Sequence, residues 1–301
     1  MNTLIIDKQN ANVEVKSGKI YTQNHTVPLK LVDMLILTQN ARIEPSAVLS
    51  ITAADVPILY LANNSRHFAI TLPAISKNSE LKIMQYFAQK SRLQIAKSLI
   101  YEKFTTHQAS LEEFDMPISI EEELRALALA ASIQEVMGIE GAFAKRYFGH
   151  YFRLFERRLA KGYRSKNPPQ DPVNALLSYM YTLGYYALSA KLYMRGLDPS
   201  ISYLHTPFRN HFALSSDLLE PLRAQINNFV AKLFLDGVVT YDSFTLKQGV
   251  YLKSTSRREL WTHIVPFMNS MSKQNNTQII KLKRQLKDAT SSYEPPHSMC
   301  A

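Results

Sequence analysis

The sequence predicts an α+β protein, with a small N-terminal β-sandwich-like domain followed by a larger all-α C-terminal domain. Up to about residue 76, short segments rich in β-branched residues alternate with turn residues, which is typical of strands. From Lys77 onward, apolar residues recur at the spacing of helices. The length of 301 residues and the hydrophobic content of 46% suffice for more than one packed core. We therefore expect domains at residues 1–76 and 77–287, and a flexible tail at residues 288–301.

The strand segments of the first domain are bounded by turn residues. Ser46 to Thr52 fits one short helix, and Asn63-Asn64-Ser65 favours a hairpin turn between the last two strands. A sheet of this size without a helix layer usually forms a small sandwich or barrel. The predicted strands are Thr3 to Ile6, Val13 to Val15, Ile20 to Thr22, Met34 to Leu37, Val56 to Leu61 and Phe68 to Leu72.

Long helical patterns fill the second domain. Asp171 is a good N-cap before Pro172 at the first helical position, and Gly196 is a good C-cap after Arg195. Residues 288–301 contain two prolines and three serines without periodicity, which predicts the flexible tail. The predicted helices are Leu81 to Phe104, Ile120 to Gly138 with a continuation to about Gly162, Pro172 to Arg195, Leu218 to Leu235 and Arg258 to Leu286.

Composition narrows the class of partner and of chemistry. The net charge of +10 and the pI of about 9.5 indicate a polyanionic partner, although a merely soluble basic protein is the alternative. Cys300 is the only cysteine, which excludes a disulfide framework within the chain and fits a reducing, cytoplasmic location. We find no signal-peptide pattern and no apolar run near the roughly 20 residues of a membrane helix. The glycine patterns of ATP and dinucleotide sites are also missing.

A basic segment between Lys145 and Lys166 indicates contact with nucleic acid. It contains eight lysines and arginines and one acidic residue, Glu156. A solvated helix usually balances its charges, so an unbalanced helical arc with interleaved aromatic residues is typical of a track for phosphates. A solvated face is the alternative, and Arg257, Arg258, Lys281, Lys283, Arg284 and Lys287 form a second, weaker basic set. The predicted nucleic-acid-binding residues are Lys145, Arg146, Arg153, Arg157, Arg158, Lys161, Arg164 and Lys166.

Glu140 lies between Gly138 and Gly141 in a helical pattern. Two glycines inside a helix cost about 1 kcal/mol each relative to alanine, which predicts that something approaches the backbone closely there. The helical spacing places Glu140, Tyr147 and Tyr151 on a stripe between an apolar face and the basic arc, where a tyrosine could help to position DNA. An ordinary glutamate at the boundary of a core is the alternative.

His205, Asp217 and Glu220 lie downstream in less regular surroundings. His205 precedes Thr206-Pro207 on a predicted loop, where a lone histidine is more often structural, and His211 is a nearby competitor. Asp217 and Glu220 fit an N-cap and a capping box at a helix start, with Pro221 as a mild misfit. The same pair could hold a cation, one carboxylate as ligand and the other through water or as a supporting group.

Carboxylate, imidazole and carboxylate are together ligands that a divalent cation can use in a phosphoryl-transfer site. In a basic chain, such a site suggests chemistry on nucleic acid.

Four ordered segments resemble the CRISPR-associated adaptation integrase family, the "Cas-one" proteins that insert spacers into repeat arrays. The likeness spans residues 138–223, and Arg92-Leu93-Gln94-Ile95-Ala96-Lys97 with the β-then-α layout extends it over nearly the whole chain. The segments are Gly138-Ile139-Glu140-Gly141, Asp171-Pro172-Val173-Asn174-Ala175-Leu176-Leu177-Ser178, Gly196-Leu197-Asp198-Pro199 with Leu204-His205, and Phe212-Ala213-Leu214-Ser215-Ser216-Asp217-Leu218-Leu219-Glu220-Pro221-Leu222-Arg223.

The resemblance implies a catalytic set of Glu140, His205, Asp217 and Glu220. By the same resemblance, Glu140, His205 and Glu220 are the metal ligands for Mg²⁺ or Mn²⁺, with Asp217 in support. Some family members have aspartate where Glu220 stands, which leaves open which acid binds directly. The family also implies a homodimer formed through the β domain, a second small adaptation protein ("Cas-two") as partner, and double-stranded DNA with 3′ ends, the prespacer and the repeat.

The implied activity is that of a metal-dependent DNA integrase and endonuclease. A 3′-hydroxyl of the prespacer would attack a phosphodiester of the repeat by direct transesterification. One alternative is the integrase of a self-synthesising transposon, whose core is related. Another is a non-catalytic DNA-binding scaffold, in which Asp217 and Glu220 only cap a helix.

Overall fold

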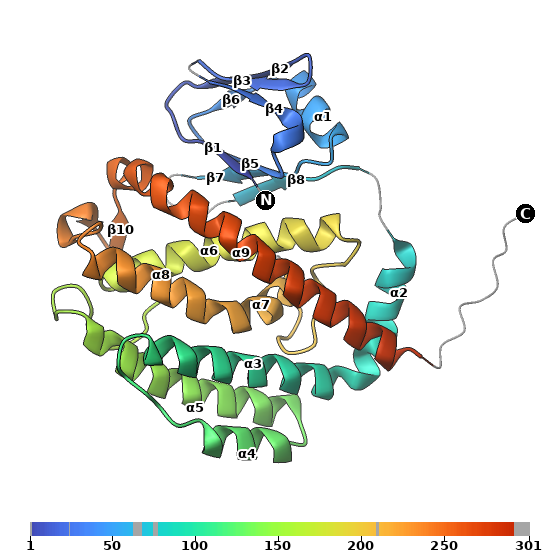
Figure 1. Cartoon of the computed structure of the whole chain (residues 1–301). Coiled ribbons are helices and arrows are strands. Elements are labelled where there is room, and N and C mark those ends of the chain that lie inside the picture. Colours follow the sequence, from blue (N-terminus) through green and yellow to red (C-terminus); the bar gives the residue numbers. More distant parts are fainter. Residues whose placement is uncertain (1, 24, 63–67, 75–77, 209–210, 292–301) are drawn as a thin grey trace, which may run out of the picture.

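A strand-rich domain lies on one side of a larger helical domain, which confirms the predicted α+β fold class (Figure 1). The computed structural model describes residues 2–23, 25–62, 68–74, 78–208 and 211–291. The expected boundary near residue 76 and the predicted turn at Asn63-Asn64-Ser65 lie outside these residues.

The N-terminal domain contains two facing sheets. One sheet has the strand order β1-β5-β7-β8, with β1, β5 and β7 parallel and β8 antiparallel to β7. The other has the order β4-β3-β2-β6, and the predicted short helix is present as α1. The short strands β4 and β6 were not predicted, because two or three residues carry too little alternation. The elements are β1 (Thr3–Ile6), β2 (Asn12–Lys16), β3 (Lys19–Tyr21), β4 (Thr26–Pro28), η1 (Leu29–Leu31), β5 (Met34–Thr38), β6 (Arg42–Ile43), α1 (Pro45–Ala53), β7 (Ile58–Leu61) and β8 (Phe68–Thr71).

Strand β5 joins the cores of the two domains. Every residue of β5 is buried, which explains its uninterrupted apolar run. Leu35 and Leu37 pack into the core between the sheets and α1, whereas Met34 and Ile36 pack into the core of the helical domain. Because successive side chains of a strand point to opposite faces, one strand serves both cores.

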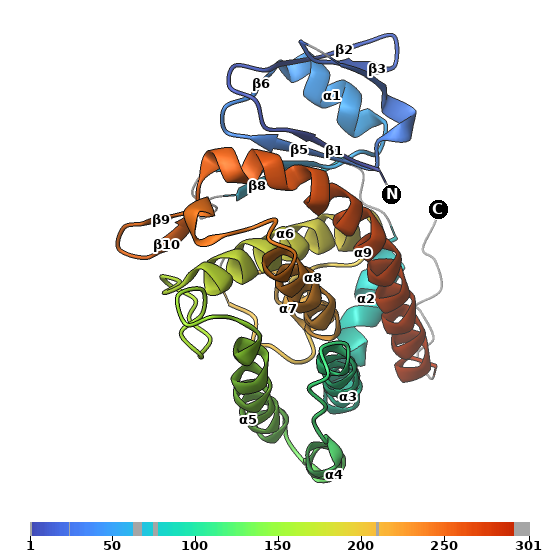
Figure 2. The ribbon, with the colours of Figure 1, turned by 60° about the vertical axis from the view of Figure 1, so that its left-hand side comes forward.

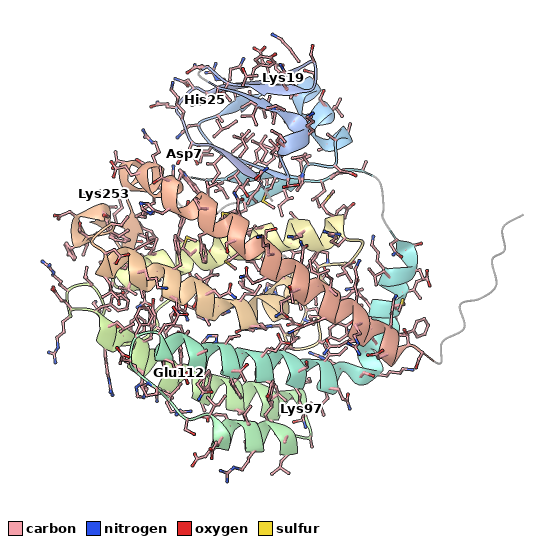
Figure 3. All side chains as sticks on the ribbon, in the orientation of Figure 1. Asp7, Lys19, His25, Lys97, Glu112 and Lys253 are labelled. Carbon is pink, nitrogen blue, oxygen red and sulfur yellow. The ribbon has the colours of Figure 1, made fainter. Side chains whose placement is uncertain are left out.

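An ion pair holds the β domain on helix α9 (Ser254–Ala289), whose N-terminal part lies between that domain and the other helices (Figure 2). Asp7 lies at the edge of the β domain beside the N-terminal part of α9 (Figure 3). Its carboxylate accepts hydrogen bonds from Arg257 at 2.9 and 3.0 Å and from the Trp261 indole at 2.8 Å. Arg257, predicted as part of the second basic set, is therefore a buried structural residue.

The helical domain departs from the prediction where one helix was expected to run from Ile120 to about Gly162. Helix α4 (Glu121–Leu129) ends, and α5 (Ile133–Tyr151) begins after a break. Ser132 caps α5 by accepting from the Glu135 amide at 3.2 Å, and the Glu135 carboxylate accepts from the Ala131 amide at 2.8 Å. After η3 (Phe152–Leu154), the chain is irregular up to Asp171.

The remaining helices follow the predicted order. The expected helix from Leu81 to Phe104 is divided into α2 (Ser79–Phe87) and α3 (Arg92–Glu112) by η2 (Ala88–Ser91). Asp171 caps α6 as predicted, and Gly196 follows that helix with a φ of 81°. None of the helices in the described ranges is long and apolar enough to cross a membrane.

Two further departures lie near the C-terminus. A hairpin of β9 and β10 interrupts the domain predicted to be all-α, and α9 continues through Asp288 and Ala289, where the tail was expected to begin. The elements here are α6 (Pro172–Met194), α7 (Ala213–Leu219), η4 (Glu220–Leu222), α8 (Arg223–Leu235), η5 (Tyr241–Ser243), β9 (Phe244–Leu246) and β10 (Val250–Leu252).

Candidate functional site

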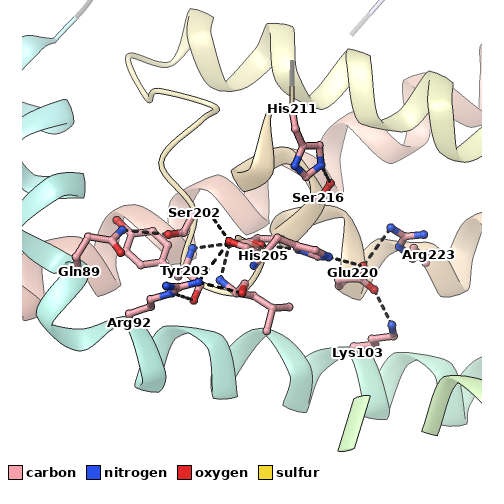
Figure 4. A network of polar contacts seen from close by, with 12 residues as sticks. Gln89, Arg92, Lys103, Ser202, Tyr203, His205, His211, Ser216, Glu220 and Arg223 are labelled. Atoms are coloured by element: carbon pink, nitrogen blue, oxygen red, sulfur yellow. Dashed lines mark hydrogen bonds and ion pairs between the residues drawn. The ribbon is translucent and has the colours of Figure 1, made fainter. Parts of the chain in front are cut away.

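Two of the predicted ligands, Glu140 and Glu220, meet at a lysine that was not predicted. Glu140 lies on α5, Glu220 opens η4, and Lys103 reaches them from α3. The Lys103 ammonium donates to Glu140 Oε1 and, at 2.6 Å, to Glu220 Oε2. Figure 4 shows Lys103 reaching from α3 to Glu220, with Arg223 on another side of the same carboxylate. Three elements thus bring one cation and two anions together.

The charges of this cluster favour the ionised forms of Glu220 and Lys103. Burial alone raises the pKa of Glu220, but the charges of Arg223 and Lys103 lower it well below its ordinary value. Burial lowers the pKa of Lys103, and the charges of Glu220 and Glu140 more than reverse this effect. Arg223 lies 3.1 Å from Glu220 Oε1, so each oxygen of Glu220 has a cationic partner.

Asp217 holds the segment that carries His205. Its Oδ2 accepts from the amides of Tyr203 at 2.6 Å and Leu204 at 2.9 Å. Its Oδ1 accepts from the His205 amide at 2.9 Å and contacts His205 Nδ1 at 2.8 Å. A carboxylate can only accept here, so Nδ1 carries a proton, and in the neutral ring this tautomer leaves the Nε2 lone pair available. Asp217 is fully buried, and both of its oxygens are occupied.

The opposite side of the His205 segment is held from α3. Arg92 Nε donates to the carbonyl of Tyr203 at 2.7 Å, and its Nη2 donates to that of Leu204 at 3.2 Å. The Ser202 hydroxyl also donates to the His205 carbonyl at 2.7 Å (Figure 4). Backbone donors and acceptors of this loop are therefore both satisfied, which fixes where the imidazole points.

His205 Nε2 lies 3.9 Å from Glu220 Oε1, too far for a hydrogen bond. Two ligands of one ion, each about 2.1 Å from it, lie roughly 3 to 4 Å apart, so this pair fits a common cation. Among the described residues, no group of three His, Cys, Asp or Glu side chains forms a ready metal site. The Lys103 ammonium instead stands between the two glutamates.

Comparison with known proteins identifies the family. The sequence pattern described as "CRISPR associated protein Cas1" matches residues 2–265. The chain belongs to the Cas1 family. It is 30% identical over 292 residues to "CRISPR-associated endonuclease Cas1 1" of Thermodesulfovibrio yellowstonii, covering 87% of this chain and 89% of that protein.

Solved structures share the fold of this Cas1 chain. A CAS1 protein from Thermotoga maritima has a TM-score of 0.86 at 18% identity, over 95% of this chain and 97% of that one. A casposase bound to integration product has a TM-score of 0.85 at 22% identity, over 98% and 92%. A chain of a partial Cas6-RT-Cas1–Cas2 complex has a TM-score of 0.63 at 18% identity, over 96% of each chain.

The capping interpretation of Asp217 and Glu220 is wrong. The helix that contains Asp217 begins at Ala213, after Phe212 at its N-cap, so Asp217 lies within α7. Glu220 follows at the junction with η4, and its carboxylate faces Lys103 and Arg223 rather than a helix N-terminus. Neither acid is the N-cap of a helix. Their three-residue spacing reflects contacts with other segments of the chain rather than a capping box.

The chain itself does not supply the close approach expected at the glycines beside Glu140, and the expected role of the two tyrosines is wrong. Apart from the neighbouring residues of its own helix, a Cβ built at Gly138 or Gly141 would meet no atom of the described chain within 4 Å. Tyr147 and Tyr151 are fully buried, and both hydroxyls hydrogen-bond to Asn227. They therefore belong to the core of this Cas1 fold and cannot contact DNA as they stand.

The basic segment does not form one helical face, because α5 ends at Tyr151. The Arg164 guanidinium donates to Asn174 Oδ1 at 2.9 Å and to Ser178 Oγ at 3.0 Å, so it ties the irregular segment to α6. Arg146 donates to Glu123 at 2.5 Å, and the exposed Arg158 pairs with Glu156 at 2.8 Å. The remaining basic residues of the predicted set are exposed: Lys145, Arg153, Arg157, Lys161 and Lys166.

Three site residues were missed from the sequence: Lys103, Arg92 and Arg223. Lys103 follows Leu99 and Ile100 at helical spacing and precedes Phe104, so it falls on the apolar face of α3. A lysine on such a face must be paired when it is buried, which is the signal that could have found it. His211, the competitor of His205, instead contacts Ser216 Oγ at 2.8 Å.

Proposed function

We propose that this Cas1 chain is a metal-dependent DNA endonuclease and integrase that inserts prespacer DNA into a CRISPR repeat array. The observation that carries the proposal is that Glu140 and Glu220 share the Lys103 ammonium, while His205 Nε2 lies 3.9 Å from Glu220 Oε1. Its relatives are named CRISPR-associated endonucleases, and one structure of the same fold is a casposase bound to integration product. The reaction we propose is transesterification, in which a prespacer 3′-hydroxyl attacks a repeat phosphodiester.

Mg²⁺ or Mn²⁺ fits the donor set that we propose as ligands, Glu140, His205 and Glu220. Two carboxylates and one imidazole nitrogen suit these ions. When bound, the ion supplies Lewis-acid polarisation of a phosphoryl oxygen and neutralises developing charge. His205 can serve as a neutral ring because Asp217 accepts from Nδ1, which directs Nε2 toward the site.

We assign Asp217 a positioning role rather than a ligand role. Both of its oxygens are used on the loop of His205, and none faces Glu140 or Glu220. A carboxylate behind a ligating imidazole fixes the tautomer and the direction of the ring. These contacts support our proposal that Glu220, rather than Asp217, binds the metal ion directly.

Exposed cations near the site suit the DNA backbone. Partial burial of the Lys166 side chain lowers its pKa, and the nearby charges of Arg223 and Arg164 lower it further. We propose that Lys166 and the exposed Lys145, Arg153, Arg157 and Lys161 bind phosphates without reading bases. Arg146 and Arg158 are held by acidic partners and contribute less, while Arg164 acts within the fold.

The proposed partners follow the family. One neighbour of the same fold is part of a complex with Cas2, and we propose that this chain also binds a small Cas2 protein. We further propose a homodimer formed through the β domain and double-stranded DNA with 3′ ends as substrate. A cytoplasmic location would suit these partners.

The proposal is tested by strand transfer with a prespacer duplex and a repeat-containing plasmid in Mn²⁺. Glu140→Gln removes one ligand charge and is expected to lower joining more than about 100-fold, because ligand loss should exceed the effect of losing a supporting group. Glu112→Gln, on exposed α3 surface (Figure 3), is the matched control and should join normally. Equal joining by wild type and Glu140→Gln would contradict the proposal.

A further inference from the structure

The Lys103 ammonium binds the two carboxylates that we propose as ligands of the metal ion. It is the shared partner of Glu140 Oε1 and Glu220 Oε2, and the residue is only 4% exposed. Carboxylates that converge from different elements repel each other unless a cation separates them. Lys103 is the cation that separates them in this structure.

The cluster is already neutral without a metal ion. The charges of Lys103 and Arg223 offset those of Glu140 and Glu220, and Arg223 also stacks over the ring of Tyr181 at 4.7 Å. A divalent cation added to a neutral buried cluster would meet repulsion from both basic groups. Loading therefore requires one of the two to leave its carboxylate.

Lys103 is better suited to leave than Arg223. A lysine side chain is a flexible four-carbon stem with a compact charge, whereas a stacked guanidinium is held in one plane. The backbone of Lys103 is fixed independently, because its carbonyl accepts from Thr106 Oγ1 at 3.1 Å and from His107 Nδ1 at 2.8 Å. The ammonium can thus swing away while α3 stays in place.

Resting on the proposed function, we propose that Lys103 is a built-in competitor of the metal ion. It satisfies the two ligand carboxylates while no metal is bound, and its ammonium leaves them when the ion binds. The residue therefore sets the metal concentration at which the site loads. It acts through Glu140 and Glu220 and is a positioning residue rather than a catalytic one.

The test measures Mn²⁺ binding to the full chain, by the loss of the free-ion EPR signal and by melting temperature during titration. Lys103→Met removes the charge and keeps much of the stem. We expect this variant to melt below wild type in chelator, because two carboxylates lose their cation, and to bind Mn²⁺ about tenfold more tightly or better. Lys97→Met is the control on the same helix, since the Lys97 ammonium donates to the Ala128 carbonyl at 2.8 Å rather than to either glutamate.

Lys103→Gln provides a second neutral variant should Lys103→Met fold poorly, and the same tightening is expected. Unchanged or weaker Mn²⁺ binding by the folded neutral variants would overturn the role of Lys103 as competitor. Wild-type protein that binds no Mn²⁺ by either readout would instead contradict the proposed metal site itself. Tighter binding confined to the Lys103 variants, and absent from Lys97→Met, would support the inference.

Discussion

Asp217→Asn is expected to destabilise the protein by about 3–5 kcal/mol and to weaken Mn²⁺ binding about 10- to 100-fold. The carboxylate accepts two hydrogen bonds on each oxygen, three of them from backbone amides. An asparagine amide would turn an NH₂ group toward donors, so buried amides of the His205 loop would lose their partner. The free energy of unfolding in denaturant and the Mn²⁺ affinity measure the two effects.

Ser216→Ala is the matched control for this substitution. Ser216 lies beside Asp217 on α7, and its hydroxyl contacts His211 rather than the His205 loop. The serine variant should keep wild-type Mn²⁺ affinity. Should Asp217→Asn match Ser216→Ala in both stability and Mn²⁺ affinity, the positioning role of Asp217 would be wrong.

Asp7→Asn is expected to weaken the contact between the β domain and α9 by about 3–5 kcal/mol, because it leaves a buried guanidinium without its anion. The side chains of Asp7 and Arg257 are 4% and 5% exposed, and the guanidinium holds both carboxylate oxygens. The measurement is the free energy of unfolding at neutral pH. The exposed pair of Glu14 and Lys16 supplies the control, since Glu14→Gln should leave stability nearly unchanged.

The effect of Asp7→Asn should depend on pH. Burial raises the pKa of Asp7, but hydrogen bonds from Arg257 and Trp261 and the Arg257 charge bring it below the ordinary value of 3.8. A lowered pKa means that the ion pair stabilises the folded chain above about pH 3.8, and that this contribution is lost as the pH falls through the folded-state pKa. The difference between wild type and Asp7→Asn should therefore narrow in acid, and a constant difference down to pH 2 would contradict the ion pair.

Sequence patterns that act within a few residues predicted the fold correctly where no contact with a distant segment opposed them. The strand Thr3–Ile6 and the helix Pro172–Met194 appear as expected, because alternation and the Asp171 cap act within a few residues. The break between α4 and α5 was missed although Ser132 and Glu135 form a capping box in the sequence. Apolar spacing continued across that break and concealed it.

At the site, short-range sequence patterns gave the wrong prediction because contacts with other segments determine the structure there. Asp217 and Glu220 have the spacing of a capping box, yet their partners lie far away in the chain. Asp217 binds amides 12 to 14 residues upstream, and Glu220 binds Lys103 across 117 residues. Residue spacing within one helix cannot predict contacts with other segments. The same limit made the half-buried Arg164 and the buried Arg257 look like surface charges.

The sequence alone determined the α+β order of the two domains, the basic character of the chain and the identities of Glu140, His205, Asp217 and Glu220 as candidates. The first two properties depend on residue type and near-neighbour spacing, whereas the four candidates depend on the resemblance of ordered segments to the Cas1 family. Only the tertiary structure decided that Asp217 faces the His205 loop, that Glu220 faces His205, and that Lys103 stands between the glutamates. The physical reason is that charge pairing falls steeply with distance, and the distances between distant segments exist only once the helices have packed.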